Sequence, residues 1–201
     1  MHIQWCLKGI RSRTTFTDAD AFALLDNGIP SNWLLANPAV SCAAAISTVQ
    51  SLLSESLLVS HVNQYATVAN ITPYISLSAG VVLPDTRLGT RVMPAWESAV
   101  GFATDFGKSD GYIYRLWTVV APQPAPELLH LSDEIRNLNL FRQTYKYQKQ
   151  GEITAKLVIP PVQIEYVTKI GKDGTVLGIR RDNLRFVEPK SVSNLLEEIN
   201  A

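Results

Sequence analysis

Cysteine is scarce in this chain of 201 residues, which contains only Cys6 and Cys42. The two thiols do not form a Cys-x-x-Cys pair, and no cluster of cysteine and histidine accompanies them. Because a disulfide scaffold needs several cysteines and a structural zinc site needs closely spaced ligands, neither is expected. The sequence offers no ligand set for a metal, and we predict no metal site.

Long apolar runs are also missing. No uncharged stretch approaches the roughly 20 apolar residues that cross a bilayer, and the N-terminus lacks the basic start and apolar run of a signal peptide. We therefore expect no membrane partner. We expect a chain that stays in the cytoplasm, or one that is delivered into a target cell by machinery that reads no such signal.

Neither sign of charge is in excess, because the formal net charge is zero with 18% charged and 46% hydrophobic residues. This composition predicts a globular chain, and the length predicts one domain over residues 1–201. Residues 1–135 hold seven Lys/Arg and eleven Asp/Glu, whereas residues 136–201 hold eleven and seven. The basic C-terminal third indicates either an anionic partner or ordinary surface charge.

Hydrophobic periodicity places most predicted helices in the N-terminal half and most predicted strands in the C-terminal half. We predict helices over Asp18–Gly28, Ser41–Val59, Ala95–Phe106, Ser132–Arg136 and Ser191–Asn200. We predict strands over His2–Lys8, Thr72–Ser78, Gly111–Val120, Glu127–Leu131, Glu152–Ile159, Val162–Lys169 and Asn183–Glu188.

One stretch organises the functional argument. Glu152 stands where a loop becomes a strand, and the chain continues as E-x-x-A-x-x-x-I-P-x-x-Q-I to Ile164. Gln150 lies two residues before Glu152, so both side chains point to one side of an extended backbone. From spacing alone, an exposed strand end is the favoured interpretation of this polar pair.

The pattern from Glu152 to Ile164 resembles the catalytic strand of mono-ADP-ribosyltransferases of the arginine–serine–glutamate class, to which cholera toxin, pierisin and scabin belong. The resemblance implies that Glu152 is the catalytic residue and that Gln150, in a Gln-x-Glu motif, presents the acceptor. Members that modify arginine carry Glu at that position, and many that modify asparagine side chains or DNA bases carry Gln. The implied fold is α+β, an ADP-ribosyltransferase-like split β-sheet core of two packed antiparallel sheets with surrounding helices.

The segment Tyr74–Ser78 is similar to the aromatic–aliphatic–Ser–Thr–Ser strand of that family, with Leu in place of the central Thr. The resemblance implies that Ser76 hydrogen-bonds Glu152 and holds its rotamer, and that Ser78 and His61 line the NAD site. Without the resemblance, an edge strand accounts for the segment, because the proline before it donates no ladder hydrogen bond. A purely structural role accounts for the lone histidine.

The first predicted strand ends at Lys8, where the family has an arginine that binds NAD. Lysine supplies a positive charge to a phosphate but not a two-pronged hydrogen bond. Arg11 and Arg13 follow within five residues and are alternative candidates for the role. A solvated charge on a loop is the competing interpretation for each of the three.

The loop before Glu152 mixes aromatic and basic residues, and in the family this loop contacts the acceptor molecule. Such a mixture suits a nucleobase with its phosphates, and it also suits a protein surface. The candidate acceptor-binding residues are Phe141, Arg142, Tyr145, Tyr147 and Lys149.

The function implied by the resemblance is that of an NAD-dependent mono-ADP-ribosyltransferase, a glycosyltransferase that uses NAD as substrate and needs no metal. We expect a macromolecular acceptor, with a nucleic-acid base favoured over a protein side chain such as Asn or Gln. A non-catalytic module that binds a nucleotide or a partner with the same fold is a third possibility. Because such an enzyme is toxic, the resemblance also implies a toxin or defence effector, with a neutralising antitoxin or immunity protein as partner.

Overall fold

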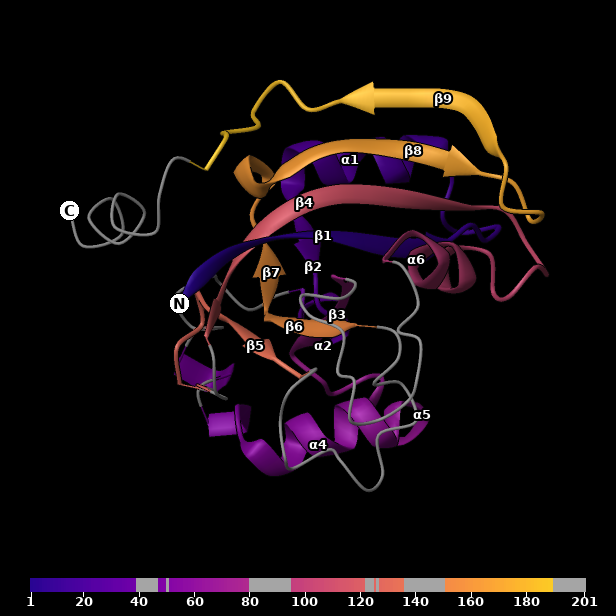
Figure 1. Cartoon of the computed structure of the whole chain (residues 1–201). Helices are drawn as coiled ribbons and strands as arrows, with labels where there is room; N and C mark the ends of the chain where they lie inside the picture. Colours follow the sequence, from indigo (N-terminus) through magenta and orange to yellow (C-terminus); the bar gives the residue numbers. More distant parts are fainter. Residues whose placement is uncertain are drawn as a thin grey trace, which may run out of the picture.

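A computed structural model describes residues 1–38, 47–49, 51–79, 95–121, 125, 127–135 and 151–189. Within these residues the chain builds a β-sheet of seven strands that is divided into two layers (Figure 1). The layer that we call the upper sheet contains, in spatial order, β9 (Val176–Asp182), β8 (Ile164–Ile170), β4 (Gly111–Ala121) and β1 (His2–Arg11). The layer that we call the lower sheet contains β3 (Tyr74–Ser78), β6 (Glu152–Lys156) and β5 (Ser132–Glu134).

The two sheets meet at both edges. On one edge β1 pairs with β3 at a single position, where Leu7 faces Ser78. On the other edge β4 pairs in parallel with β5, with Val120 facing Ser132. All other pairs of neighbouring strands in the two layers are antiparallel. The result is the split, mostly antiparallel core that the resemblance implies.

The main hydrophobic core lies between the two sheets. Because side chains alternate along a strand, Tyr112, Tyr114 and Leu116 of β4 point inward from the upper sheet, and Leu77 and Ile153 point inward from the lower sheet. Helix α1 (Asp18–Asn27) closes one side of this core and adds Ala21 and Leu25. A two-stranded sheet of β2 (Ile29–Pro30) and β7 (Val158–Ile159) lies beside it, and the 3₁₀ turn η3 (Pro161–Gln163) leads into β8.

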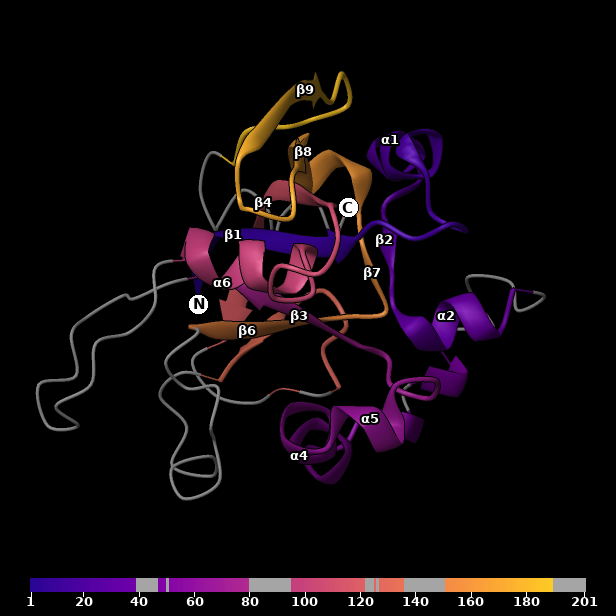
Figure 2. The ribbon, with the colours of Figure 1, turned by 90° about the vertical axis from the view of Figure 1, so that its right-hand side faces the viewer.

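A second layer of helices covers the outer face of the lower sheet. It consists of α2 (Asn32–Ala36), α4 (Glu55–Asn63) and α5 (Tyr65–Val68). Trp33, Leu58 and Val62 from these helices pack with Tyr74 of β3 in a second hydrophobic cluster. Figures 1 and 2 both show α4 and α5 on the far side of β3 and β6 from the upper sheet.

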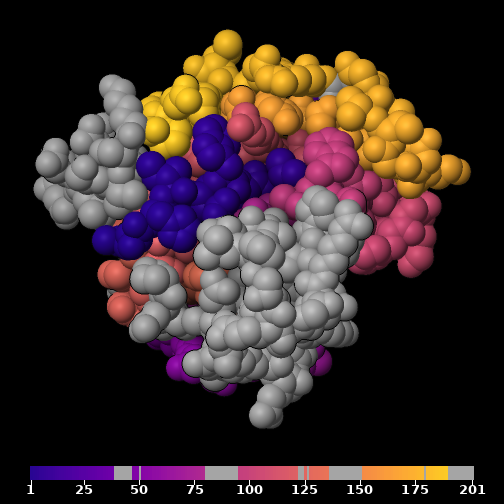
Figure 3. Space-filling model, viewed as in Figure 1, coloured from indigo at the N-terminus to yellow at the C-terminus, as the bar shows by residue number. Residues whose placement is uncertain are grey.

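Helix α6 (Ala95–Ala103) packs against β1 and β4 at the end of the upper sheet. Two glycines permit this close approach. A Cβ at Gly9 would lie 2.3 Å from the carbonyl oxygen of Ala99, and a Cβ at Gly111 would lie 1.9 Å from that of Ala103. In the space-filling view, one face of the molecule brings together the N-terminal strand in indigo, α6 in magenta, and β8 and β9 in orange to yellow (Figure 3).

Several predicted elements differ from the observed ones. The single helix predicted over Ser41–Val59 is interrupted, because the Ser54 hydroxyl accepts a hydrogen bond from Leu57 N and begins α4 as a separate helix. The helical turn predicted over Ser132–Arg136 is wrong in its described part, because residues 132–134 form β5. The strand predicted over Glu127–Leu131 is likewise absent among its described residues, which form turns.

The C-terminal strands also differ in their limits. The strand predicted over Glu152–Ile159 is broken after Lys156, because Leu157 adopts φ 59° and separates β6 from β7. The last strand was expected at Asn183–Glu188, but β9 ends at Asp182. The predicted helix over Ser191–Asn200 lies outside the described residues.

Candidate active site

Glu152 opens β6 and is 8% exposed. Its Cα partner across the strand pair is Ser78, and the next residue on the same face, Thr154, faces Ser76. Ile153 points the other way into the main core, so the alternation of the strand places Glu152 on the outer face of the lower sheet. The sheet register therefore brings Glu152 and both serines of the predicted motif to one face.

Lys8 reaches this face from the edge of the upper sheet. Its Nζ donates a hydrogen bond of 3.0 Å to the backbone carbonyl oxygen of Ser76. Burial lowers the pKa of Lys8 to about 8, against an opposing contribution from the Glu152 carboxylate, which favours the ammonium form. The structure thus places the first-strand cation, the serine strand and the acidic residue within one electrostatic neighbourhood.

His61 of α4 approaches Ser76 from the helical layer. The imidazole is 2% exposed, and its two ring nitrogens lie 2.8 Å from Thr72 Oγ1 and 2.9 Å from Ser76 Oγ. Burial is the main cause that lowers the pKa of His61 to about 3, and the nearby Lys8 charge adds to it. The ring is therefore neutral at physiological pH. The Ser76 hydroxyl is bonded to His61, and its predicted bond to Glu152 stays a prediction.

Two further polar residues of this region were not predicted as functional. Ser98 of α6 is buried and its hydroxyl accepts a hydrogen bond of 3.1 Å from Ser78 Oγ. Thr72 is fully buried and accepts a hydrogen bond of 3.2 Å from Tyr74 N. Neither carries a local sequence signal beyond a small hydroxyl residue near a strand or in a helix, and only the pairing of distant elements reveals them.

Arg11 lies away from this group of residues. Its Nη1 is 2.7 Å from Asp105 Oδ2, just after α6, and the two side chains form an ion pair at the far end of β1. Arg13 is exposed and belongs to a short bridge with Phe16. Of the three candidate cations, Lys8 is the one that the structure brings to Ser76.

The remaining predicted site residues lie outside the described residues. They are Gln150 and the acceptor-binding candidates Phe141, Arg142, Tyr145, Tyr147 and Lys149. Gly151 is described, and its φ of 62° shows that the backbone is not extended immediately before Glu152. Its carbonyl oxygen accepts a hydrogen bond of 2.8 Å from Ala79 N. The alternation of the strand begins at Glu152, and the side predicted for Gln150 stays a prediction.

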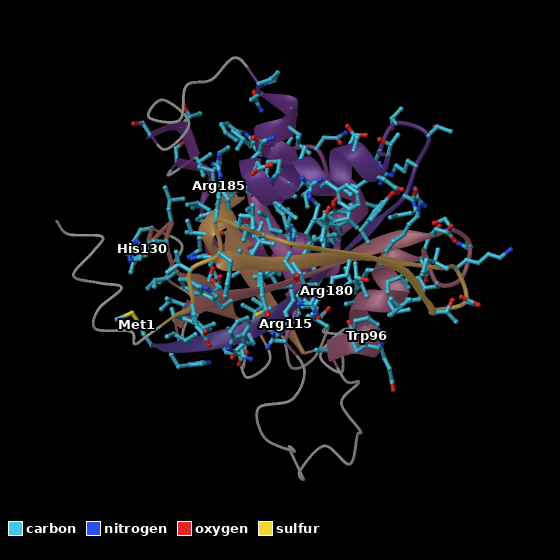
Figure 4. All side chains as sticks on the ribbon, turned by 90° about the horizontal axis from the view of Figure 1, so that it is seen from above. Met1, Trp96, Arg115, His130, Arg180 and Arg185 are labelled. Carbon is cyan, nitrogen blue, oxygen red and sulfur yellow. The ribbon has the colours of Figure 1, made fainter. Side chains whose placement is uncertain are left out.

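The charge asymmetry of the sequence is partly neutralised within the fold. Three basic residues of the C-terminal third form ion pairs with acidic residues of the N-terminal part: Lys156 with Asp133 at 3.1 Å, Lys169 with Asp18 at 2.8 Å, and Arg185 with Asp26 at 3.6 Å. On the outer side of the upper sheet, Arg115 and Arg180 are visible in Figure 4. These two also pair with carboxylates, those of Glu165 and Asp182. The three pairs with the N-terminal part therefore offset part of the basic excess.

Within the described ranges, no group of three or more His, Cys, Asp and Glu side chains is arranged to hold a metal ion. Among the same residues, no helix has the length and apolar character needed to cross a bilayer.

Comparisons with known proteins identify similar folds. No protein-family model and no curated protein matches the sequence. Among solved structures, EcPltA is similar with a TM-score of 0.53 and 13% identity, over 94% of this chain and 89% of that chain. Scabin toxin from Streptomyces scabies in complex with NADH matches with a TM-score of 0.45 and 12% identity, over 92% and 77%. A guanine-specific ADP-ribosyltransferase matches with a TM-score of 0.44 and 12% identity, over 92% and 79%.

At these identities the comparisons bear on the fold alone, and of these three matches the one to EcPltA supports it. Together with the split sheet, it confirms the predicted fold class, an ADP-ribosyltransferase-like α+β fold.

Proposed function

We propose that this chain is a mono-ADP-ribosyltransferase that transfers ADP-ribose from NAD to a macromolecular acceptor. The observation that supports the proposal most is the convergence of Lys8, Ser76 and Glu152 from three separate strands. Lys8 Nζ is hydrogen-bonded to Ser76 and electrostatically coupled to Glu152. These are the positions that the resemblance to the arginine–serine–glutamate class assigns to the reaction, with lysine in place of arginine.

The residues at this face fit the parts of NAD. A cation beside the site suits a diphosphate, and Lys8 supplies it. A fixed carboxylate suits a ribose hydroxyl, and Glu152 supplies it. NAD itself carries a good leaving group, nicotinamide, whose departure develops positive charge on the ribose. A carboxylate held in a weakly hydrated position opposes that charge more strongly in the transition state than in the ground state.

We propose a nucleic-acid base as the acceptor. Gln150, which the resemblance links to acceptors other than arginine, and the aromatic and basic residues of the loop before it support this choice. The basic excess of the C-terminal third supports it less than composition alone indicates, because part of that charge is paired internally. Transfer to a protein side chain is the second candidate, and the zero net charge favours it.

The proposal is tested by incubating the purified protein with labelled NAD and a cell extract, beside Glu152→Gln. Removing one preorganised electrostatic group lowers a rate by roughly 10²–10³-fold, and we expect a loss of that order in both label transfer and nicotinamide release. Glu188→Gln, which alters an exposed carboxylate on the C-terminal segment, is the matched control and should retain the wild-type rates.

Treatment of the labelled extract then identifies the acceptor. Loss of label with nuclease supports a nucleic-acid acceptor, and loss of label with protease supports a protein acceptor. A folded wild-type chain that neither transfers label nor releases nicotinamide would instead support the non-catalytic module.

An active enzyme of this kind depletes NAD or modifies essential molecules. We therefore also propose that the chain acts as a toxin or defence effector, held in check by a neutralising partner or by delivery into another cell. Expression of the wild-type chain alone should stop growth, whereas Glu152→Gln should not. Unchanged growth with the wild-type chain would argue against this role.

A further inference from the structure

Thr72, His61 and Ser76 form a continuous line of hydrogen bonds that ends on the serine strand. His61 Nδ1 is 2.8 Å from Thr72 Oγ1, and His61 Nε2 is 2.9 Å from Ser76 Oγ. Both ring nitrogens are therefore engaged by protein groups, and the ring is almost completely buried. This geometry gives His61 a different task from the contact with NAD that the resemblance implies.

The donor and the acceptor in each of these hydrogen bonds follow from counting the available hydrogens. Thr72 Oγ1 already accepts the backbone N–H of Tyr74 at 3.2 Å. Its own hydroxyl hydrogen needs an acceptor, because a buried donor without one is costly. The other partner that the structure gives this oxygen is His61 Nδ1, so Thr72 donates to Nδ1. A neutral imidazole carries one hydrogen, which must then be on Nε2 and be donated to Ser76 Oγ.

The consequence falls on the Ser76 hydroxyl. Because its oxygen accepts from His61 Nε2, its own hydrogen is directed away from the imidazole. Glu152 is a diagonal neighbour on the same face, since Ser78 faces Glu152 and Ser76 faces Thr154 in the register of β3 and β6. A carboxylate is an acceptor only, so it suits the hydrogen that Ser76 has left to give.

We propose that Thr72 and His61 are positioning residues that fix the Ser76 hydroxyl as a hydrogen-bond donor toward Glu152; the catalytic part of this inference rests on the proposed function. Thr72 sets the tautomer of His61, and His61 sets the direction of Ser76. Lys8 adds a second restraint, since its bond to the Ser76 carbonyl oxygen holds the backbone of the same residue. The low pKa of His61 agrees with this role, because a protonated ring could not accept from Thr72.

The tautomer can be measured without any assay of activity. Nitrogen NMR of the histidine rings distinguishes a protonated ring nitrogen from an unprotonated one, and His61→Gln identifies the His61 signals among the three histidines. We expect hydrogen on Nε2 in the wild-type chain and a mixture of tautomers in Thr72→Val. Hydrogen on Nδ1, or a charged ring at neutral pH, would overturn the proposed direction.

The kinetic test uses NAD turnover. Loss of one orienting hydrogen bond should lower kcat by about 5- to 30-fold in Thr72→Val, while KM for NAD stays within about twofold, because the substrate is not touched. Thr72→Ser should restore kcat, since it keeps the hydroxyl. Thr67→Val is the control, because Thr67 is exposed and bonds only to the nearby Gln64 carbonyl oxygen in the structure.

A second pair of variants guards against poor folding of Thr72→Val. The amide of Gln in His61→Gln can both accept from Thr72 and donate to Ser76, whereas His61→Leu can do neither. We expect His61→Gln to retain much more turnover than His61→Leu. Equal kcat in the wild-type chain and in folded Thr72→Val or His61→Leu would overturn the positioning role. Absence of turnover in the wild-type chain would overturn the proposed function instead, and the NMR result would still stand.

Discussion

Lys8 and Ser76 are 68 positions apart in the sequence, and a hydrogen bond of 3.0 Å from Lys8 Nζ to the Ser76 carbonyl oxygen joins them. The bond crosses from the upper sheet to the lower sheet beside their pairing at Leu7 and Ser78. It leaves the ammonium group in partly buried surroundings with Glu152 as a nearby counter-charge. Lys8, the cation of the candidate site, therefore titrates close to pH 8 and is not permanently charged.

The first prediction concerns pH and Lys8. Because its pKa is about 8, the ammonium is lost above that pH, and kcat/KM for NAD should fall by about tenfold per pH unit on the alkaline side. Lys8→Arg keeps its charge throughout this range and should extend the plateau toward pH 10. The pH profiles of the two proteins, measured by nicotinamide release, check this expectation.

The stability of the fold distinguishes this alkaline fall in kcat/KM from a loss of activity through unfolding. The pKa of Lys8 is lower in the folded chain than its usual value of 10.5, so the unfolded chain binds more protons between about pH 8 and 10.5. Lys8 therefore adds to the free energy of unfolding as pH rises through that window. The control is Lys172→Arg, at an exposed position in the β8–β9 turn. It should leave the pH profile of kcat/KM unchanged. Identical alkaline limbs in wild type and Lys8→Arg would contradict the assignment.

The second prediction concerns acid stability and His61. Its pKa is about 3 in the folded chain and 6.5 in the absence of the fold, so the unfolded state binds the additional proton as pH falls below 6.5. The free energy of unfolding should then decrease with a slope that approaches about 1.4 kcal/mol per pH unit from this residue alone. His61→Gln should lack that component in urea titrations between pH 7 and pH 5. His130→Gln, at an exposed position, should keep it, and equal slopes for His61→Gln and wild type would contradict the burial of a neutral ring.

Much of the fold could be predicted from local pattern. The strand that begins at His2, the helix from Asp18 to the glycine at 28, and the strand from Gly111 all appear where alternation and capping residues place them. In β4 the run of aromatic and β-branched residues matches burial on both sides of the strand. The serine strand and the strand that opens at Glu152 also form, and their pairing brings the predicted residues to one face.

The errors occur where distant contacts override local preference. Residues 132–134, Ser-Asp-Glu, have poor strand propensity, yet they form β5 because Asp133 meets Lys156 across the sheet. Leu157 ends β6 with a left-handed φ of 59° although no glycine or proline marks the position. Backbone bonds to two other segments, from Leu157 N to the Pro73 carbonyl oxygen and from Ser31 N to the Leu157 carbonyl oxygen, hold it there. Thr72 was missed as a partner of His61 for the same reason.

The third prediction concerns the buried ion pair of Lys156 and Asp133. Both side chains are fully buried, and Lys156 Nζ also donates to the carbonyl oxygens of Ala125 and Leu128. Burial lowers the pKa of Lys156 and raises the pKa of Asp133, so each charge depends on the other. Lys156→Met or Asp133→Asn alone should reduce the free energy of unfolding by about 3–5 kcal/mol.

A double-mutant cycle checks the coupling of this pair. The double variant Lys156→Met/Asp133→Asn should cost less than the sum of the single variants, because no buried charge is left without its partner. The exposed pair of Arg180 and Asp182 is the comparison, and Arg180→Met should cost no more than about 1 kcal/mol. Additive losses at Lys156 and Asp133 would show that the two charges stabilise the fold independently.

The last prediction concerns the contact between β1 and α6. A Cβ at position 9 would lie 2.3 Å from the Ala99 carbonyl oxygen and 2.8 Å from Ala103 N. Both atoms belong to the backbone of α6. The clash is therefore relieved only if the helix moves, because no change of side-chain rotamer removes it. Gly9→Ala should therefore reduce the free energy of unfolding by about 1–3 kcal/mol, as measured by urea denaturation.

The displacement should also reach the candidate site, because α6 holds Ser78 through the bond to Ser98. Nicotinamide release by Gly9→Ala should fall under conditions where the variant is still folded. Gly101→Ala is the matched control on the same helix. Its new methyl group would meet the side-chain ring of Phe106, which is exposed and has room to turn aside, and no backbone atom. Alanine also favours a helix over glycine. Equal losses of nicotinamide release in the two variants would show that the close approach at Gly9 does not position α6. A loss confined to Gly9→Ala would show that the spacing of β1 and α6 supports the serine strand.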